Sequence, residues 1–392
     1  GLGRMATQPP RHRPTASIER LEPSVDTSMV RGGIEYSDYL LVDNDARFVS
    51  EMALQAVRYG AVIANRVDVV AAETGVGGWR VGLRDVLADR SFQCSATLVV
   101  NAAGPYVPDV GNLTGTATDH RLVFSKGIHL VVPRITDSGR ILAFFDDGER
   151  LFYVLPMGER SVIGTTDTPV EDPDVSVTGE DRSFLLEQIN ARIDLPRPLT
   201  AADVIADRCG VRSLAVEPGG SAEGRDWTEL SRRHAVEVDR TLGVVSILGG
   251  KLSDCLNVGD EVVEAAGDCG LEARTPVARW YGEPGRTARR RFNERASGLG
   301  LNQQVAEDLW RRQGMRAFPT LDLIDEDRSL GDPMGGLVPL TEAEVRVMAD
   351  HERILEPEDF LRRRTMLAQV ERDEDLASDE AVQRALGILG MV

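Results

Sequence analysis

Two apolar runs in this chain each end in a turn of small residues, and this arrangement restricts the fold most strongly. Residues 98–105 read Leu-Val-Val-Asn-Ala-Ala-Gly-Pro, and residues 246–252 read Ser-Ile-Leu-Gly-Gly-Lys-Leu. In α/β folds, an apolar strand that runs into a glycine turn brings the backbone close to a ligand. A helix expected at 257–266 places the second turn near a helix N-terminus, where backbone N–H groups attract anions. The pattern predicts an α/β domain with a ligand site at these turns.

The middle of the chain, residues 119–168, has a different pattern. Short apolar runs are separated there by Pro, Gly and Asp, which favours an antiparallel sheet in a lobe of its own. The strands of this lobe are expected at 129–132, 141–145, 151–155 and 161–164.

The remaining elements follow from apolar periodicity. Residues 1–28 are rich in Pro and Arg and aperiodic, so we expect a poorly ordered lead-in. After Pro276 the pattern is helical, and Thr341 followed by Glu344 is a capping-box signature. The expected helices are 43–60, 181–193, 302–312, 341–351 and 356–370, and the other expected strands are 61–64, 67–73, 79–83, 92–100, 202–206, 234–238 and 243–248.

Composition excludes several classes of protein. The chain has 392 residues, 42% of them apolar, which excludes collagen-like and fully disordered chains. A net charge of −18 makes it a poor non-specific binder of nucleic acid. No apolar run approaches the ~18–20 residues that span a bilayer. Four cysteines without CxxC spacing indicate neither a zinc site nor a disulfide framework, so a cytoplasmic location is expected and no metal.

Two cations stand out as candidates for chemistry. Of the 45 Lys and Arg residues only two are lysines, Lys126 and Lys251, and each adjoins a glycine. A tight site that needs a compact point charge cannot easily take the wide guanidinium of Arg. Chance placement in an arginine-biased chain explains the same pattern. Arg212, between apolar residues after Gly210, needs an anionic partner, either a structural carboxylate or a substrate phosphate.

Two further residues have a plain and a functional interpretation. His129 begins an apolar strand, where most histidines are hydrogen-bonded core residues. If it faces a cleft it can accept a proton near neutral pH. Thr166 lies in the run Gly-Thr-Thr-Asp-Thr-Pro at 164–169, which is typical of a turn and would also suit a polar pocket. The arginines between 286 and 295 favour a salt-bridged face over a contact with lipid.

Together these motifs resemble FAD-dependent glycerol-3-phosphate dehydrogenase, of the superfamily of glycine oxidase and D-amino-acid oxidase. The resemblance covers roughly residues 30–392, in matching order and spacing. The chain of motifs is specific, although each motif alone is weak. The matching stretches are 32–38 (GGIEYSD), 45–47 (DAR), 99–105 (VVNAAGP), 126–133 (KGIHLVVP), 163–168 (IGTTDT), 210–214 (GVRSL), 249–252 (GGKL), 351–352 (HE) and 359–364 (DFLRRR).

The resemblance implies a fold, a reaction and partners. The fold is α/β plus α: an FAD-binding domain at 29–105 and 207–270, a substrate-binding β cap lobe at 106–206 and an α-helical domain at 276–392. The implied reaction oxidises sn-glycerol 3-phosphate to dihydroxyacetone phosphate with FAD and passes electrons to a quinone at the inner membrane face. A second copy of this chain is a further candidate partner.

The resemblance also implies roles for individual residues. His129 is the candidate base, Arg212 the candidate ligand of the substrate phosphate, and Lys251 the cation beside the flavin. Lys126 and Thr166 are further candidates for binding the substrate. The candidate cofactor-binding residues are Asn101, Ala102, Gly104, Gly249, Gly250, Lys251 and Leu252.

The chain departs from the family pattern in two places. The family opens with a βαβ unit carrying GxGxxG, which is absent here, so we expect exposed sheet edges and exposed apolar surface. The family follows GGK with Thr-Thr-Tyr-Arg, whereas residues 253–256 here are Ser-Asp-Cys-Leu. Two alternatives therefore stay open: a catalytically inert remnant or interaction module, and a related FAD enzyme such as a glycerol-3-phosphate oxidase or a 2-hydroxyacid dehydrogenase.

Overall fold

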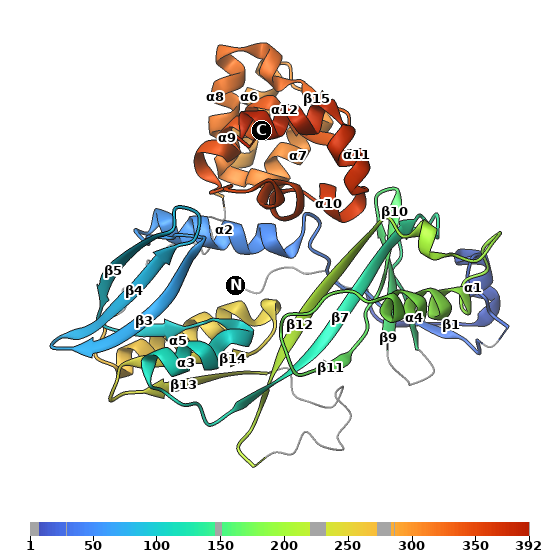
Figure 1. Ribbon diagram of the computed structural model, residues 1–392. Helices are drawn as coiled ribbons and strands as arrows, with labels where there is room; N and C mark the ends of the chain where they lie inside the picture. Colours follow the sequence, from blue (N-terminus) through green and yellow to red (C-terminus); the bar gives the residue numbers. More distant parts are fainter. Residues whose placement is uncertain are drawn as a thin grey trace.

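Three groups of elements build the molecule in the computed structural model. The model describes residues 8–28, 30–145, 151–219, 233–272, 284–285 and 287–391. A long antiparallel sheet forms one lobe, a smaller α/β part with a separate meander forms another, and a helical part lies above both (Figure 1). These groups match the expected class of α/β plus α.

The two predicted strand–turn–helix units lie side by side in one sheet. Strand β6 (Val99–Asn101) pairs in parallel with β14 (Val244–Gly249), and β13 (His234–Asp239) completes the sheet antiparallel to β14. Each parallel strand leads into a helix, α3 (Val107–Thr114) after β6 and α5 (Cys255–Asp268) after β14. The two glycine turns therefore meet at the carboxyl edge of one sheet.

A three-stranded meander packs on this sheet. It consists of β3 (Val67–Gly75), β4 (Gly78–Asp85) and β5 (Arg90–Ala96). Trp79 anchors it, because the buried indole donates a 2.9 Å hydrogen bond to the carbonyl of Leu242 and packs on Val244. The expected strand 92–100 is thus two strands in different sheets. The strand expected at 61–64 is wrong: this stretch forms no strand, and Val62 is almost fully exposed.

The β lobe is built around one long strand. Strand β7 (Arg121–Pro133) pairs with β10 on one side and with β12 on the other, and β11 pairs with its first half. One face of this sheet packs on helix α4 (Gly179–Asn190) through Ile128, Leu130, Leu185 and Ile189. The other strands are β8 (Leu142–Phe145), β9 (Leu151–Met157), β10 (Arg160–Gly164), β11 (Thr168–Val170) and β12 (Ala206–Val216). The antiparallel lobe is confirmed.

Two expectations near this lobe are wrong. The strand expected at 202–206 is a 3-10 turn at Ala201–Asp203, closed by a capping box between Thr200 and Asp203. The lead-in is not disordered over its described residues, because Ile18 and Val25 pack on the core of the lobe. It forms β1 (Arg11–Arg13) and α1 (Thr15–Leu21), and β1 pairs with β2 (Gly33–Glu35).

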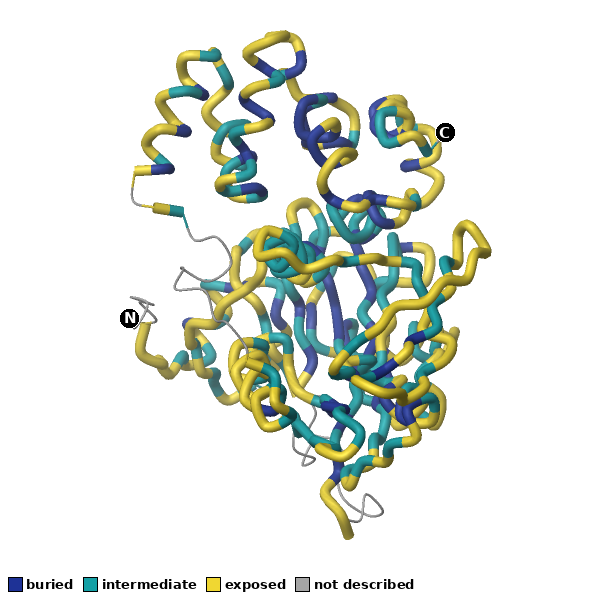
Figure 2. The backbone as a smooth tube through the Cα atoms, turned by 90° about the vertical axis from the view of Figure 1, so that its left-hand side faces the viewer, coloured by how far each residue is buried: buried dark blue, intermediate teal, exposed yellow. Residues whose placement is uncertain are grey.

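The helical part contains two apolar clusters of its own, visible as dark segments in the upper part of Figure 2. One surrounds Phe292 and Leu309, and the other surrounds Met348 and Phe360. The capping box of Thr341 and Glu344 is confirmed. The helices are α6 (Ala288–Gly298), α7 (Gln303–Gln313), α8 (Ala317–Glu326), α9 (Glu342–His351), α10 (Leu367–Val370), α11 (Asp373–Ser378) and α12 (Glu380–Ile388), with a hairpin of β15 (Pro333–Gly335) and β16 (Val338–Thr341).

The expected helix 356–370 is interrupted. Residues Asp359–Arg364 form a π-helical turn, and α10 follows it only after Thr365. The Thr365 hydroxyl donates to the Phe360 carbonyl at 2.8 Å, which closes this turn.

Helix α2 (Asp45–Arg58) confirms the expected helix at 43–60, with Asn44 as its N-cap. The segment before it is extended and apolar, and Ile34, Tyr39 and Val42 each expose more than half of their surface. Exposed apolar surface was expected, and it is present. Among the described residues, no helix is both long and apolar enough to cross a membrane.

Candidate functional site

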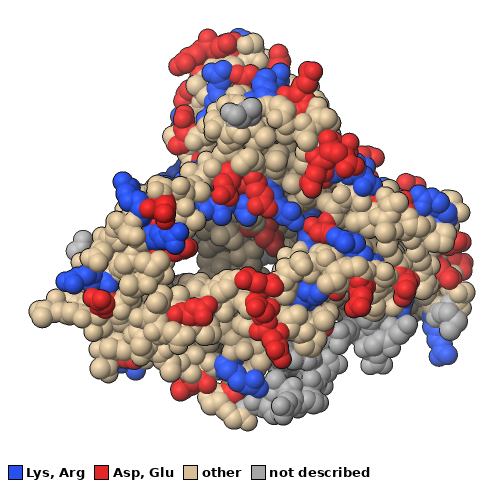
Figure 3. All heavy atoms as spheres, in the orientation of Figure 1, with Lys and Arg blue, Asp and Glu red and all other residues tan. Residues whose placement is uncertain are grey.

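A deep hollow opens in the middle of the molecule (Figure 3). It lies below α2, between the small mixed sheet of β13, β14 and β6 on one side and strands β7 and β12 on the other (Figure 1). The face of the β lobe that does not pack on α4 turns toward this hollow. The predicted site residues are therefore best followed strand by strand from that face.

Strands β7 and β12 place Arg212 and His129 on one face. In their antiparallel register Arg212 pairs with Ser125 and Arg208 pairs with His129. Alternate residues of a strand point to opposite faces, so these four side chains share the face opposite α4. The structure thus brings together the candidate base and the candidate phosphate ligand.

Lys126 lies on the opposite face of the sheet from Arg212. Its ammonium is nearly buried against α4 and lies 2.7 Å from an Asp181 carboxylate oxygen. The ammonium helps to hold the pKa of Asp181 below its usual value, although burial of that carboxyl works in the other direction. The structure does not bring the Lys126 ammonium together with the Arg212 guanidinium, and it gives the ammonium a structural partner.

Arg212 is held by the loop at 164–168. Its guanidinium donates to the Thr165 hydroxyl at 2.9 Å and to the Thr166 carbonyl at 3.3 Å, and it lies 3.6 Å from Asp167. It also lies flat against Gly127, where a Cβ would come within 2.6 Å of both terminal nitrogens. Of the two partners considered from sequence, a structural carboxylate is therefore present. The side chain stays about one-third exposed and reachable by a ligand.

His129 is half-buried, and its pKa is lowered to about 4. Burial is the main cause, and the positive charges of Arg208 and Arg212 add to it. The imidazole is therefore neutral near pH 7 and has a lone pair that can accept a proton.

The Thr166 side chain binds the backbone of strand β7. Its hydroxyl accepts a hydrogen bond from the amide of Ile128 at 3.1 Å and lies 3.4 Å from the carbonyl of Lys126. Its side chain thus has the structural role expected of a turn residue. The open pocket beside this turn is lined by Glu180 and Asp181, a poor lining for a phosphate.

The turn after β6 is fixed by Asn101. The buried side-chain amide of Asn101 donates to the Val107 carbonyl at 2.9 Å, which ties the strand to the first turn of α3. Ala102 is exposed, and Gly104 has a φ of +58°. A Cβ at Gly104 would meet no atom within 4 Å, so this turn is open to a ligand.

The turn after β14 requires glycine for a different reason. Gly249 and Gly250 have φ values of +65° and +96°, and a Cβ on Gly249 would press on Ala215 of β12. The turn therefore lies directly against the strand that carries Arg212. Lys251 follows it, is exposed and has no carboxylate within ion-pair distance among the described residues, while Leu252 begins the 3-10 turn Leu252–Asp254.

Sequence reasoning missed His234, which lies beside the same turn. Its ring bridges two carboxylates, with Nδ1 2.7 Å from Asp254 and Nε2 3.1 Å from Glu261. Partial burial would lower the pKa of His234, but the hydrogen bonds to Asp254 and Glu261 outweigh it and raise the pKa. Asp254 is one of the departures from the family pattern, and that departure was the available signal.

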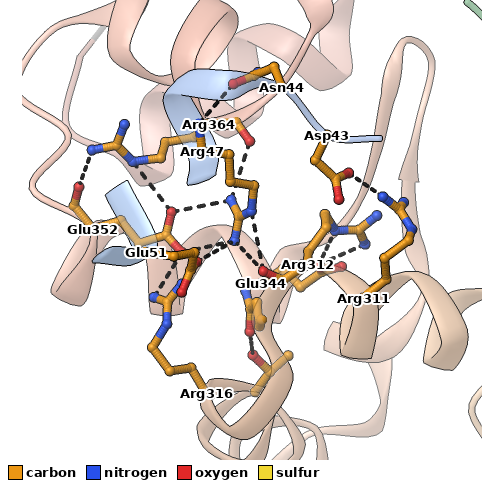
Figure 4. Close-up of polar contacts among 12 residues, drawn as sticks. Asp43, Asn44, Arg47, Glu51, Arg311, Arg312, Arg316, Glu344, Glu352 and Arg364 are labelled. Atoms are coloured by element: carbon orange, nitrogen blue, oxygen red, sulfur yellow. Dashed lines mark hydrogen bonds and ion pairs between the residues drawn. The ribbon is translucent and has the colours of Figure 1, made fainter. Parts of the chain in front are cut away.

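An ionic network joins α2 to the helical part above the hollow (Figure 4). Glu352 is buried and has guanidinium groups on several sides, with Arg316 at 3.1 Å, Arg47 at 3.4 Å and Arg364 at 3.5 Å. Arg47 also donates to the Arg312 carbonyl at 3.0 Å. This network fixes the position of α2, and with it the upper wall of the hollow.

Comparison with known proteins agrees with this architecture. Residues 2–249 match the family model described as FAD dependent oxidoreductase, and residues 278–389 match that of the C-terminal domain of alpha-glycerophosphate oxidase. A crystal structure of the glycerol-3-phosphate dehydrogenase from Bacillus halodurans complexed with FAD has the same fold, with a TM-score of 0.74 at 24% identity. The match covers 98% of this chain and 78% of that one.

Curated relatives are similar over most of this chain. Glycerol-3-phosphate dehydrogenase 2 of Mycobacterium tuberculosis is 30% identical over 367 residues, which cover 91% of this chain and 61% of that protein. Mitochondrial glycerol-3-phosphate dehydrogenase of Mus musculus is 27% identical over 396 residues, covering 94% and 51%. The chain thus spans between half and three-fifths of the length of these relatives. The resemblance seen in the motifs is confirmed, and the chain belongs to the family of FAD-dependent oxidoreductases.

Proposed function

We propose that this chain oxidises sn-glycerol 3-phosphate to dihydroxyacetone phosphate with FAD. The observation that carries the proposal is the face of β7 and β12, where a neutral imidazole lies beside arginine side chains at the wall of a hollow. The names of the relatives support the same substrate. Sheet, loops and glycine turns supply the rigid frame that such a site needs.

The residues at the carboxyl edge of the small sheet fit FAD. The open turn at Gly104 leads into α3, and the turn at Gly250 leads into α5, so both present helix N-termini to an anionic or flat ligand. Lys251 adds an exposed ammonium at the same edge. Asn101, Ala102 and Gly104 would border the adenosine and pyrophosphate side. Gly249, Gly250, Lys251 and Leu252 would border the flavin ring.

The proposed reaction divides its tasks among three side chains. FAD, when bound, accepts the hydride from C2 of the substrate. Arg212 binds the phosphoryl group through its forked donors, and His129 takes the proton of the C2 hydroxyl, so that alcohol becomes ketone with loss of one hydride and one proton. Lys251 stabilises negative charge at the edge of the site.

The same proposal extends to a quinone as the electron acceptor, reached at the inner face of a membrane. The helical part is the candidate contact. Arg289, Arg290 and Arg295 of α6 already have carboxylate partners, which supports the salt-bridged interpretation of this cluster. Arg286 lies outside the described residues.

Arg212→Ala tests the substrate assignment. We expect purified protein to contain flavin and glycerol 3-phosphate to bleach its absorbance. In Arg212→Ala the apparent KM should rise about 10- to 100-fold, since a charge-assisted hydrogen bond contributes ~1.5–3 kcal/mol. Arg240→Ala removes an exposed arginine paired with Asp268 and is the matched control. Colourless protein whose melting temperature ignores added FAD would instead support an inert remnant.

A further inference from the structure

Arg208 is the arginine on the hollow-facing side of β12 that lacks an anionic partner. Its Nε is buried and has no hydrogen-bond acceptor. One of its terminal nitrogens donates to the thioether sulfur of Met157 at 3.2 Å, and a thioether is a weak acceptor. No carboxylate of the described residues lies within ion-pair distance of its guanidinium.

The charged surroundings of Arg208 are mostly of its own sign. Burial lowers the pKa of this guanidinium, and the positive charge of Arg362 lowers it further. Asp45, at the start of α2, is the carboxylate that acts in the opposite direction. A buried arginine stays protonated, so the face of β12 opposite α4 holds a positive charge that has no ion-pair partner among the described residues.

His129 lies directly across from Arg208. The two residues pair in the register of β7 and β12, and Arg212 lies four residues further along β12 on the same face. The neutral imidazole can donate one N–H, and the Arg208 fork can donate several, in a geometry that suits oxygen anions. Donors without acceptors, partly buried under net positive charge, are the complement of an oxyanion.

We propose that Arg208 and His129 form an oxyanion subsite beside Arg212, on the same face of the sheet, and that this subsite binds a phosphate group. The phosphate is either a free ion or the phosphoryl end of the substrate, and only the latter alternative rests on the proposed function. The unpaired Nε of Arg208 is the atom that the ligand satisfies.

Filling the subsite changes the chemistry of His129. In the unliganded protein the pKa of His129 is about 4, a weak base for taking a hydroxyl proton. A bound anion offsets the charges of Arg208 and Arg212, and an opposite charge within a few ångströms raises a histidine pKa by about 1–3 units. The subsite therefore makes His129 a competent base only when an anion is present.

Histidine NMR on the purified chain tests the subsite without measuring activity. The His129 resonance, identified by its loss in His129→Asn, is titrated with pH in the presence and absence of inorganic phosphate. We expect phosphate to raise the His129 pKa by at least about one unit in the parent chain. In Arg208→Met the pKa should already be higher without phosphate and should no longer respond to it.

Two controls separate binding from folding. Arg208→Met should be no less stable to urea than the parent, because it removes a buried unpaired charge, whereas loss of a paired structural arginine destabilises. Arg240→Gln, at an exposed and distant pair, should leave the response to phosphate intact. A His129 pKa that ignores phosphate in the parent chain, or that responds equally in Arg208→Met, overturns the subsite.

The source of the phosphate is read from a second titration. If the substrate supplies it, glycerol 3-phosphate raises the His129 pKa without any added inorganic phosphate. Inorganic phosphate then competes with glycerol 3-phosphate for the subsite. If a free ion supplies it, glycerol 3-phosphate and inorganic phosphate bind together. Both results support the subsite, and only the first also supports the proposed substrate, so the two proposals can fail separately.

Discussion

His234 shows how one side chain can fasten a functional turn. The Cβ of His234 packs on Gly250, and a Cβ added to Gly250 would come within 3.0 Å of it. The His234 ring contacts Asp254 and Glu261. It thereby connects β13, the 3-10 turn after Lys251 and helix α5. Because the hydrogen bonds raise its pKa, the protonated ring is the form that the fold prefers.

His234→Asn should weaken the fold at acid pH more than at alkaline pH. A raised folded-state pKa gives stability that is complete below the unfolded value of about 6.5 and is lost as pH rises through the folded value. Since the carboxylates are partly exposed, we expect a loss of ~0.5–1 kcal/mol near pH 5.5 and little near pH 8.5. Urea unfolding at both values checks this.

At the scale of elements, local signals predicted the structure where they were sufficient by themselves. The capping-box spacing of Thr341 and Glu344 correctly predicted the start of α9, and the apolar periodicity of residues 43–60 correctly predicted α2. Strand β12 was missed, because Asp207, Arg208, Gly210 and Arg212 give it no apolar alternation. Pairing with β7 along its whole length makes it a strand, and such long-range pairing is not encoded locally.

In the candidate site, too, the sequence predicted local features and missed those that depend on long-range contacts. Glycine turns and an arginine in need of an anion were visible in the sequence. The two faces of β7 were not separated, so Lys126 was grouped with Arg212, although its partner Asp181 lies on the far side of the sheet. The sequence did not predict the His234 cluster, because its members lie 20 or more positions apart in the chain. It did not predict the unpaired Nε of Arg208 either, because only the fold shows that this atom is buried.

Thr341→Ala should cost more stability than Thr178→Ala. Both threonines form capping boxes, and in both the partner carboxylate also binds a cation at 2.7 Å, but Thr341 is buried and Thr178 is exposed. We expect about 1–2 kcal/mol for Thr341→Ala and about half of that for Thr178→Ala, measured by urea unfolding. Equal losses would mean that burial adds nothing to the cap.

At the scale of the whole molecule, the helical part is fastened to the rest by charge. Glu352 is 1% exposed, and Arg47, Arg316 and Arg364 surround its carboxylate (Figure 4). Burial would raise the pKa of Glu352, but these three guanidinium groups outweigh it and hold the pKa below its usual value. The network therefore loses its stabilising effect as pH falls through that lowered pKa.

Glu352→Gln should be strongly destabilising. It removes the buried carboxylate that three guanidinium groups share, and Arg47 and Arg316 then keep only the partly exposed Glu51 as a carboxylate partner. Breaking a buried ion pair from one side typically costs about 3–5 kcal/mol. Glu371→Gln is the matched control, because Glu371 joins the helical part to the β lobe through a partly exposed pair with Arg160 at 2.9 Å. We expect ~0–1 kcal/mol for the control. Calorimetry would report both values, and similar losses would remove the special role of the buried network.

Alternate residues of strand β7 point to two different environments, the apolar core under α4 and the hollow. Ile128 and Leu130 pack beneath α4, while Gly127 and His129 line the hollow. Inserting or deleting one amino acid in this strand would exchange the two faces. The imidazole would then be buried in the apolar core, and a leucine would lie on the face that is proposed to bind phosphate. Length changes here are thus tolerable only in pairs, a constraint on how descendants of this chain can diverge.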